Sequence, residues 1–406
     1  PRAVVATFSN TSCTGVPFNF VPANTGSNII PGGTLYTWTS PAGTGFIGGS
    51  AQNTPVANIS GTLSHSNATV VSAVYTITPV SGGCTGTVFT TTIFIQPAAA
   101  INALSASICS GAGFVVTPAP VTNGVVPNGT LYTWLAPSAV NITGATPGTL
   151  LSSVSGTLVN TTNEISSITY QVSTLSGACS GNVFTLVVWV KPVPAVQSMF
   201  TSTCSGVAFE LVPVNGVNGN IPSTTRYSWS APTGAGISNG AAGNLASTIS
   251  GNLTNSTALP ATATYIVTPV ADNCTGTSFT VTIQVKPKPT LNSVVNAPAI
   301  CSGTLFQYTP TSATPGTGFV WTTIGISGIT ASEPLTGTGS IQQLLTNTTN
   351  AAITVTYIYS LVADGCAGHG TDAVTVLVKP LPALTSSLTP PNIYTLSLIH
   401  ISEPTR

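Results

Sequence analysis

Apolar and polar residues alternate along short stretches of this chain. Residues 279–285 read Phe, Thr, Val, Thr, Ile, Gln, Val, so apolar side chains occupy every second position. A period of two places one face of a strand on a core and the other in water. A similar stretch, residues 265–268, comes shortly before, and glycine-bearing turns such as residues 80–83 separate paired stretches of this kind. The pattern predicts antiparallel strands joined by short hairpins.

The strand pattern belongs to a unit that occurs four times. The first landmark is Cys-(Ser/Thr)-Gly-x-x-Phe-x-x-(Val/Thr)-Pro, and its copies begin at Cys13, Cys109, Cys204 and Cys301. The second is an aromatic residue two positions before a Trp, and the third is a Tyr nine positions before a second Cys. The landmark Trp residues are Trp38, Trp134, Trp229 and Trp321. Short strands with turn signals at this spacing predict a sandwich of about seven strands in roughly 100 residues, with the Trp and Tyr in its core.

Prolines that follow the last strand of each unit mark its boundary. We therefore expect β-sandwich repeats at residues 1–97, 98–192, 193–287 and 288–380. The predicted fold class is therefore all-β, a tandem array of four antiparallel immunoglobulin-like sandwiches. Because proline stiffens the linkers between them, we expect the array to be rod-like. Residues 381–395 resemble the truncated start of a fifth repeat. Residues 396–406 resemble a translated sequencing adapter, so we expect that they are not part of the natural protein.

The chain carries very little charge. Only seven Lys or Arg and seven Asp or Glu occur among 406 residues. This composition disfavours helices, and the lack of a basic cluster argues against a nucleic-acid partner. No apolar run approaches the roughly 20 residues that span a bilayer, so we expect no membrane insertion of this segment. So few titratable groups cannot assemble a catalytic centre, and the sequence predicts no enzyme and no cofactor.

Two cysteines occur in each repeat, at a nearly constant separation along the chain. An even count in register with the repeat predicts disulfides and an oxidising, extracellular compartment. Pairing within each repeat is the favoured interpretation, and bridging between adjacent repeats is the alternative. The cysteines concerned are Cys13, Cys84, Cys109, Cys179, Cys204, Cys274, Cys301 and Cys366. No Cys-x-x-Cys motif and no recurring His supports a metal site.

A few other residues could have a function. Trp189 has no Trp equivalent in the other repeats, so it is a candidate ligand contact or a local core substitution. His369 and Asp372 lie near Asp364 in the fourth repeat only, so a metal or acid-base role is disfavoured. Several Asn-x-Ser/Thr sequons occur, and glycans on Asn or Ser/Thr would solvate a chain with so few charges. These sequons begin at Asn58, Asn67, Asn141, Asn160, Asn252, Asn255 and Asn347.

The repeat resembles the PKD-like or immunoglobulin-like modules of Bacteroidota surface proteins. The motifs that carry the resemblance are at residues 204–206 (Cys-Ser-Gly), 265–269 (Tyr-Ile-Val-Thr-Pro), 273–276 (Asn-Cys-Thr-Gly) and 285–287 (Val-Lys-Pro). The resemblance implies a very large secreted protein linked to adhesion or gliding motility.

The expected function is a non-catalytic structural or adhesive stalk segment of such a cell-surface protein. Surface glycans or other cell-surface proteins are its expected partners. The alternative is a set of glycan-binding accessory modules of a secreted polysaccharide hydrolase.

Overall fold

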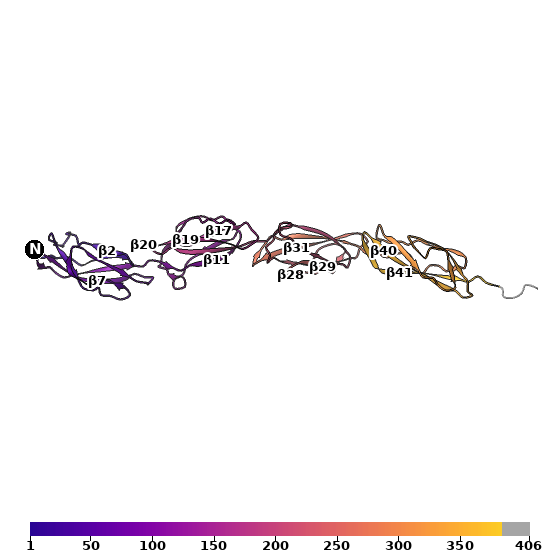
Figure 1. Cartoon of the computed structure of the whole chain (residues 1–406), viewed down its shortest axis with the longest axis horizontal. Helices are drawn as coiled ribbons and strands as arrows, with labels where there is room; N and C mark the ends of the chain where they lie inside the picture. Colours follow the sequence, from indigo (N-terminus) through magenta and orange to yellow (C-terminus); the bar gives the residue numbers. More distant parts are fainter. Residues whose placement is uncertain (384–406) are drawn as a thin grey trace, which may run out of the picture.

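The computed structural model describes residues 1–383, which contain strands and no helix. They form four β-sandwich modules arranged end to end in a rod (Figure 1). Each module has its own cluster of buried apolar side chains. The predicted all-β tandem array is confirmed.

Modules 1 to 3 share the strand order of their main sheet, although modules 2 and 3 contain more short strands than module 1. Module 1 contains β1 (Phe8–Cys13), β2 (Pro17–Phe20), β3 (Leu35–Trp38), β4 (Ile47–Gly48), β5 (Gln52–Val56), β6 (Ile59–Ser64), β7 (Val71–Ser81), β8 (Cys84–Thr85) and β9 (Phe89–Gln96). Module 2 contains β10 (Ala100–Ile101), β11 (Leu104–Cys109), β12 (Gly113–Val116), β13 (Gly124–Val125), β14 (Thr130–Trp134), β15 (Ile142–Thr143), β16 (Gly148–Leu151), β17 (Val154–Thr157), β18 (Val159–Asn160), β19 (Ser166–Ser176), β20 (Cys179–Ser180) and β21 (Phe184–Lys191). Module 3 contains β22 (Ala195–Val196), β23 (Met199–Cys204), β24 (Ala208–Leu211), β25 (Gly219–Asn220), β26 (Arg226–Trp229), β27 (Ile237–Ser238), β28 (Gly243–Ala246), β29 (Ile249–Asn252), β30 (Thr254–Asn255), β31 (Ala261–Ala271), β32 (Cys274–Thr275) and β33 (Phe279–Lys286).

Module 4 departs from this arrangement at its first strand. It contains β34 (Ile300–Cys301), β35 (Thr304–Tyr308), β36 (Gly318–Thr323), β37 (Ile329–Ala331), β38 (Thr336–Thr338), β39 (Ile341–Asn347), β40 (Ile353–Ala363) and β41 (Cys366–Lys379). The strand that carries the first cysteine is two residues long here and six in the other modules.

The main sheet of each module combines antiparallel strands with one parallel pair. In module 2 its order is β11-β21-β19-β14-β16, and β20 pairs with β19. The strand β11 runs parallel to the closing strand, β21, from Leu104 beside Leu186 to Cys109 beside Lys191. Modules 1 and 3 repeat this parallel pairing, and β34 keeps two residues of it. Each closing strand therefore ends beside the first cysteine of its own module, which fixes the position of that cysteine.

The landmark aromatic residues pack in the cores as predicted. Trp134 is 3% exposed, and its indole N–H donates to the carbonyl of Thr146 at 3.0 Å. Its ring covers Gly148 on the neighbouring strand, where a Cβ atom would lie 2.3 Å from the indole. Phe114 lies 5.8 Å from Tyr170, measured between ring centroids. The Trp residues of the repeat are thus core residues and not exposed sugar-stacking platforms.

Candidate functional site

Three disulfides connect adjacent modules. They join Cys13 to Cys179, Cys109 to Cys274, and Cys204 to Cys366, with Cα–Cα distances of 5.5, 5.6 and 5.6 Å. Each one pairs the first cysteine of a module with the second cysteine of the next. The favoured prediction of pairing within a repeat is wrong, and the alternative of bridges between repeats is the one observed.

The two cysteines of a module cannot pair because they lie at opposite ends of it. The first cysteine ends the strand that runs parallel to the closing strand, as Cys109 lies beside Lys191. We call this the exit end of the module. The second cysteine lies in the hairpin that leads into the closing strand, which is the entry end. Cys109 therefore faces the next module, at the hairpin that carries Cys274.

The last residue of the closing strand makes a further contact across two of these junctions. Lys191 Nζ donates to the carbonyl of Asp272, just before Cys274, at 3.2 Å. Lys286 Nζ donates to the carbonyl of Asp364 at 3.3 Å and forms an ion pair with its carboxylate at 3.0 Å. The Asp364 side chain is largely exposed, so solvent screens this pair and it adds little to stability. The contact orients the hairpin and does not hold the modules together by itself.

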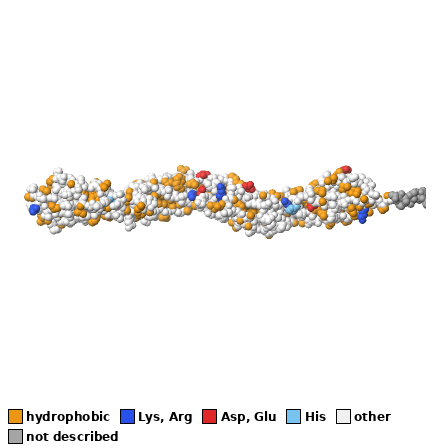
Figure 2. Space-filling model, turned by 90° about the horizontal axis from the view of Figure 1, so that it is seen from below, with side chains coloured by type: hydrophobic (Ala, Val, Ile, Leu, Met, Phe, Trp, Pro, Cys, Tyr) orange, Lys and Arg blue, Asp and Glu red, His pale blue; other side chains and the backbone are white. Residues whose placement is uncertain are grey.

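Asp364 is therefore a junction residue, in contact with Lys286 of the preceding module, and it is not grouped with His369 and Asp372. Among residues 1–383, no group of three or more His, Cys, Asp or Glu side chains could hold a metal ion. Figure 2 shows the charged side chains scattered along the rod.

Burial raises the pKa of Tyr75 and of Tyr357 to about 12, which keeps both hydroxyls neutral in the core.

A buried asparagine supports each exit end in modules 2 to 4. In module 3, the Asn255 amide donates to the carbonyls of Val285 and Leu259, both at 2.8 Å. Its backbone N–H donates to Ser205 Oγ, the residue after Cys204, at 3.0 Å. Asn255 thus ties the first cysteine's turn to the end of the closing strand. The sequence contains a signal for it, an Asn-(Ser/Thr)-Thr at a similar distance after the first cysteine of modules 2 to 4, but the same three residues also form a sequon.

The equivalent sites differ in detail but keep the same bonds. Asn160 and Asn347 donate to the last-but-one carbonyl of their closing strands, and His65 Nε2 contacts that carbonyl in module 1 at 3.0 Å. The three asparagines are 6–7% exposed. Three of the seven sequons thus place their asparagine amide in a buried, hydrogen-bonded position of the folded module.

Trp189 lies on the solvent face of β21 and is 47% exposed. Phe94, at the equivalent position of module 1, is 41% exposed. Gln284 and Leu377 occupy the position in modules 3 and 4. Trp189 is therefore a surface residue, so it is not a substitution within the core.

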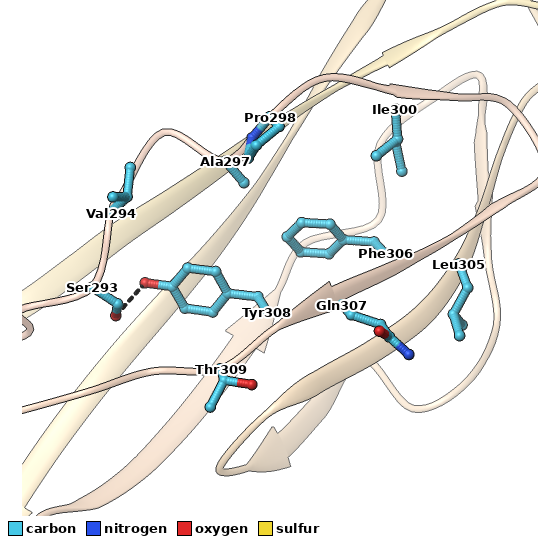
Figure 3. A pocket seen from close by; sticks show the side chains of 10 residues that line it. All are labelled: Ser293, Val294, Ala297, Pro298, Ile300, Leu305, Phe306, Gln307, Tyr308 and Thr309. Carbon is cyan, nitrogen blue, oxygen red and sulfur yellow. Dashed lines mark hydrogen bonds between the residues drawn. The ribbon is translucent and has the colours of Figure 1, made fainter.

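A groove of about 430 Å³ opens in module 4 where the first strand is short. Phe306 and Tyr308 form part of its wall, and Tyr308 Oη shares a hydrogen bond with Ser293 Oγ at 2.7 Å (Figure 3). The lining is mostly apolar, and it contains no carboxylate, imidazole or thiol. The groove thus offers apolar contact and a hydroxyl pair but no acid-base chemistry.

Cys84 and Cys301 have no disulfide partner among residues 1–383, and both are exposed. Cys84 is a second cysteine at the entry end of module 1, and Cys301 is a first cysteine at the exit end of module 4. They lie at the two outer ends of the array, where no described module of this chain faces them. The predicted fifth repeat at 381–395 and the adapter-like residues 396–406 lie outside the described residues, except for residues 381–383.

Comparison with known families resolves what the modules are. The PKD-like domain family matches residues 10–99, 104–194, 199–289 and 298–382, one match in each module. The chain belongs to the PKD-like domain family. The four matches cover most of the chain, and the comparisons indicate no family of enzymes.

Comparisons with individual proteins add little to the PKD-like assignment. No curated protein matches the sequence. Among solved structures, the insect immune protein hemolin is 13% identical with a TM-score of 0.24, covering 94% of this chain and 100% of that one. The titin I-band fragment I67–I69 is 11% identical with a TM-score of 0.33, covering 70% and 97%. Drosophila N-cadherin EC1-4 is 10% identical with a TM-score of 0.26, covering 86% and 92%. Likenesses this weak carry no argument about this chain.

The PKD-like modules contain no helix that is long and apolar enough to cross a membrane, within residues 1–383.

Proposed function

We propose that this chain is a non-catalytic structural and adhesive stalk segment of a large secreted bacterial cell-surface protein. Four tandem PKD-like modules suggest a structural or adhesive role. The observation that carries the proposal is the set of three disulfides, each joining one module to the next. A junction that is closed by a linker and by a disulfide resists bending, which suits a spacer. Disulfides persist in oxidising compartments, which supports an extracellular location.

The finer parts of the proposal rest on the sequence. We keep the domain boundaries at residues 97, 192, 287 and 380, where closing strands give way to proline. The resemblance to Bacteroidota modules and the adapter-like nature of residues 396–406 are likewise proposals. The uninterrupted reading frame from the source organism would decide both, since an adapter sequence is absent from a genome.

Small-angle X-ray scattering tests the stalk. A strand of about 12 residues spans each module, so four modules extend to roughly 160 Å and give a radius of gyration of about 45 Å. A compact protein of this size has a radius of gyration of about 21 Å. We expect the larger value for the oxidised chain, and a broader distribution of shapes after reduction with dithiothreitol. A radius of gyration of about 21 Å for the oxidised protein would be incompatible with a stalk.

The exposure of Trp189 favours glycan-binding accessory modules as the second candidate. Exposed indole rings stack on sugar faces, and Phe94 offers a ring at the equivalent site of module 1. A glycan array probed with the oxidised chain tests this function. Binding that is lost in Trp189→Ala and kept in Leu377→Ala, a change at the equivalent position of module 4, would support it. Binding to no glycan would remove this candidate and leave the stalk, whose partners would then be other cell-surface proteins.

A further inference from the structure

The bridging disulfides and the parallel strand pairs together form a continuous covalent path from one end of the array to the other. In module 2, β11 and β21 lie side by side, and both run from the entry end to the exit end. Both crossings are short and of equal length, from Pro97 to Cys109 and from Cys179 to Lys191. The chain between Cys109 and Cys179 contains β12 to β19 and forms a loop whose two ends are fixed at opposite ends of the module.

The disulfides connect these crossings from module to module. The path begins at Pro1, follows β1 to Cys13 and passes through the disulfide to Cys179. It then follows β21, the linker and β23 to Cys204. The disulfide to Cys366 and the strand β41 complete it at Lys379. We call this path line A.

Line A is much shorter than the chain and is already extended in the folded protein. It uses only residues 1–13, 179–204 and 366–379, a small fraction of the chain between its ends. Fully stretched, this backbone measures about 180 Å. Its residues lie largely in strands, which rise about 3.3 Å per residue, so the folded array already has nearly that length.

We infer that the oxidised array is an inextensible tether, in which tension runs along line A and cannot lengthen the molecule by unfolding its modules. This inference rests on the stalk function proposed above and goes further, because it assigns the load to particular strands and bonds. The Cys109–Cys274 disulfide lies on a second path, line B, which follows β9, β11, that disulfide, β33 and β34. Line B ends at Cys84 and Cys301, so it does not by itself connect Pro1 to Lys379.

The two lines give a matched pair of variants. Cys204→Ser with Cys366→Ser breaks line A between modules 3 and 4. The shortest covalent path then runs through residues 1–13, 109–179 and 274–379. This path is about 135 residues, or roughly 450 Å, longer than line A. Cys109→Ser with Cys274→Ser also removes one bridging disulfide but leaves line A intact.

Single-molecule force spectroscopy, with the full chain held by its two termini, tests the inference. We expect no unfolding step in the oxidised wild-type chain or in the Cys109/Cys274 variant before a covalent bond breaks. The Cys204/Cys366 variant should release about 450 Å of additional length, which is the difference between the longer path and line A. The reduced chain should show four steps of about 300 Å, one for each module of about 95 residues.

Unfolding steps in the oxidised wild-type chain would overturn the inference, as would equal extension of the two double variants. This outcome is distinct from failure of the stalk function. A rod seen by scattering that lengthens under force would keep the stalk and remove the tether, whereas a compact molecule would remove both.

Discussion

The buried landmark tyrosine hydroxyl has a hydrogen-bond partner in one copy of the module and none in another. In module 4, Tyr357 Oη donates to Gln343 Oε1 at 2.6 Å in a fully buried pair. In module 1, Tyr75 occupies the same landmark position, but its hydroxyl has no hydrogen-bond partner among residues 1–383. A buried polar group without a partner lowers stability, whereas a paired one does not. The same residue of the repeat should therefore have opposite sensitivity to loss of its hydroxyl.

We predict that Tyr75→Phe leaves module 1 as stable as before or stabilises it by up to about 1 kcal/mol. Tyr357→Phe should destabilise module 4 by about 1–3 kcal/mol, because it leaves the Gln343 oxygen buried and unpaired. Urea unfolding followed by hydrogen-exchange mass spectrometry measures each module separately. Equal effects of the two changes would contradict this account of the hydroxyls.

The asparagine at the exit end provides a second contrast between neighbouring residues. Asn255→Ala removes both bonds from its amide to backbone carbonyls, and we expect module 3 to lose about 2–3 kcal/mol. Asn252→Ala, in the adjacent sequon, changes an exposed residue and should shift stability by less than about 0.5 kcal/mol. Thermal unfolding of the oxidised chain, resolved by module through hydrogen exchange, measures both. A neutral Asn255→Ala would mean that the exit end does not depend on this side chain.

The strands were predictable from the alternation of apolar residues, but their partners were not. Residues 279–285 alternate as a strand with one buried face, and the structure confirms it in β33. Met199, Thr201 and Thr203 alternate with exposed residues on β23, but this alternation does not show which strand β23 pairs with or whether the pairing is parallel. The parallel pairing of first and closing strands follows from the course of the chain, which enters each module at one end and leaves it at the other. That course is a property of the array, and local sequence patterns do not contain it.

Close packing of strands against the landmark Trp leads to a prediction about glycine. Gly148 on β16 lies under the ring of Trp134, and an added Cβ would meet it at 2.3 Å. We expect Gly148→Ala to destabilise module 2 by about 1–3 kcal/mol through overpacking. Gly113→Ala on β12 is the control, because its Cβ would have no neighbour closer than 3.7 Å. Near-ultraviolet circular dichroism of the Trp signal and the unfolding midpoint should both change in the first variant only.

At the scale of the whole molecule, the repeat spacing was sufficient to predict four modules in a row. It could not decide the cysteine pairing, because the separation of two cysteines along the chain fixes the size of a loop and not the positions of its ends. The parallel first strand places Cys13 at the exit end and the hairpin places Cys84 at the entry end. The sequence does not decide between a surface and a core position for Trp189 for a similar reason, since the register of its strand determines which face it occupies.

The two unpaired cysteines occupy positions that are bridged elsewhere in the array. Consider a tandem chain in which a second copy of residues 1–379 follows Lys379 directly. Pro1 of the second copy then takes the place of a linker proline, because it precedes Cys13 by the same distance as Pro97 precedes Cys109. We predict a disulfide from Cys301 of the first copy to Cys84 of the second. Titration of the oxidised, denatured protein should find two free thiols per tandem chain.

The control for this experiment is the same tandem chain with Cys301→Ser in its first copy, which should show three free thiols. Four free thiols in the unchanged tandem chain would show that the outer ends are not equivalent to the internal junctions.

The bridges between modules also impose an order on the maturation of the protein. Cys13 cannot be oxidised correctly until Cys179 has been made, 166 residues later, and until the hairpin that carries it has folded. Cys84 is the nearer thiol in sequence, but folding of module 1 holds it at the far end. Folding itself therefore protects each early thiol from the wrong partner. Oxidation should proceed along the nascent array one module behind folding.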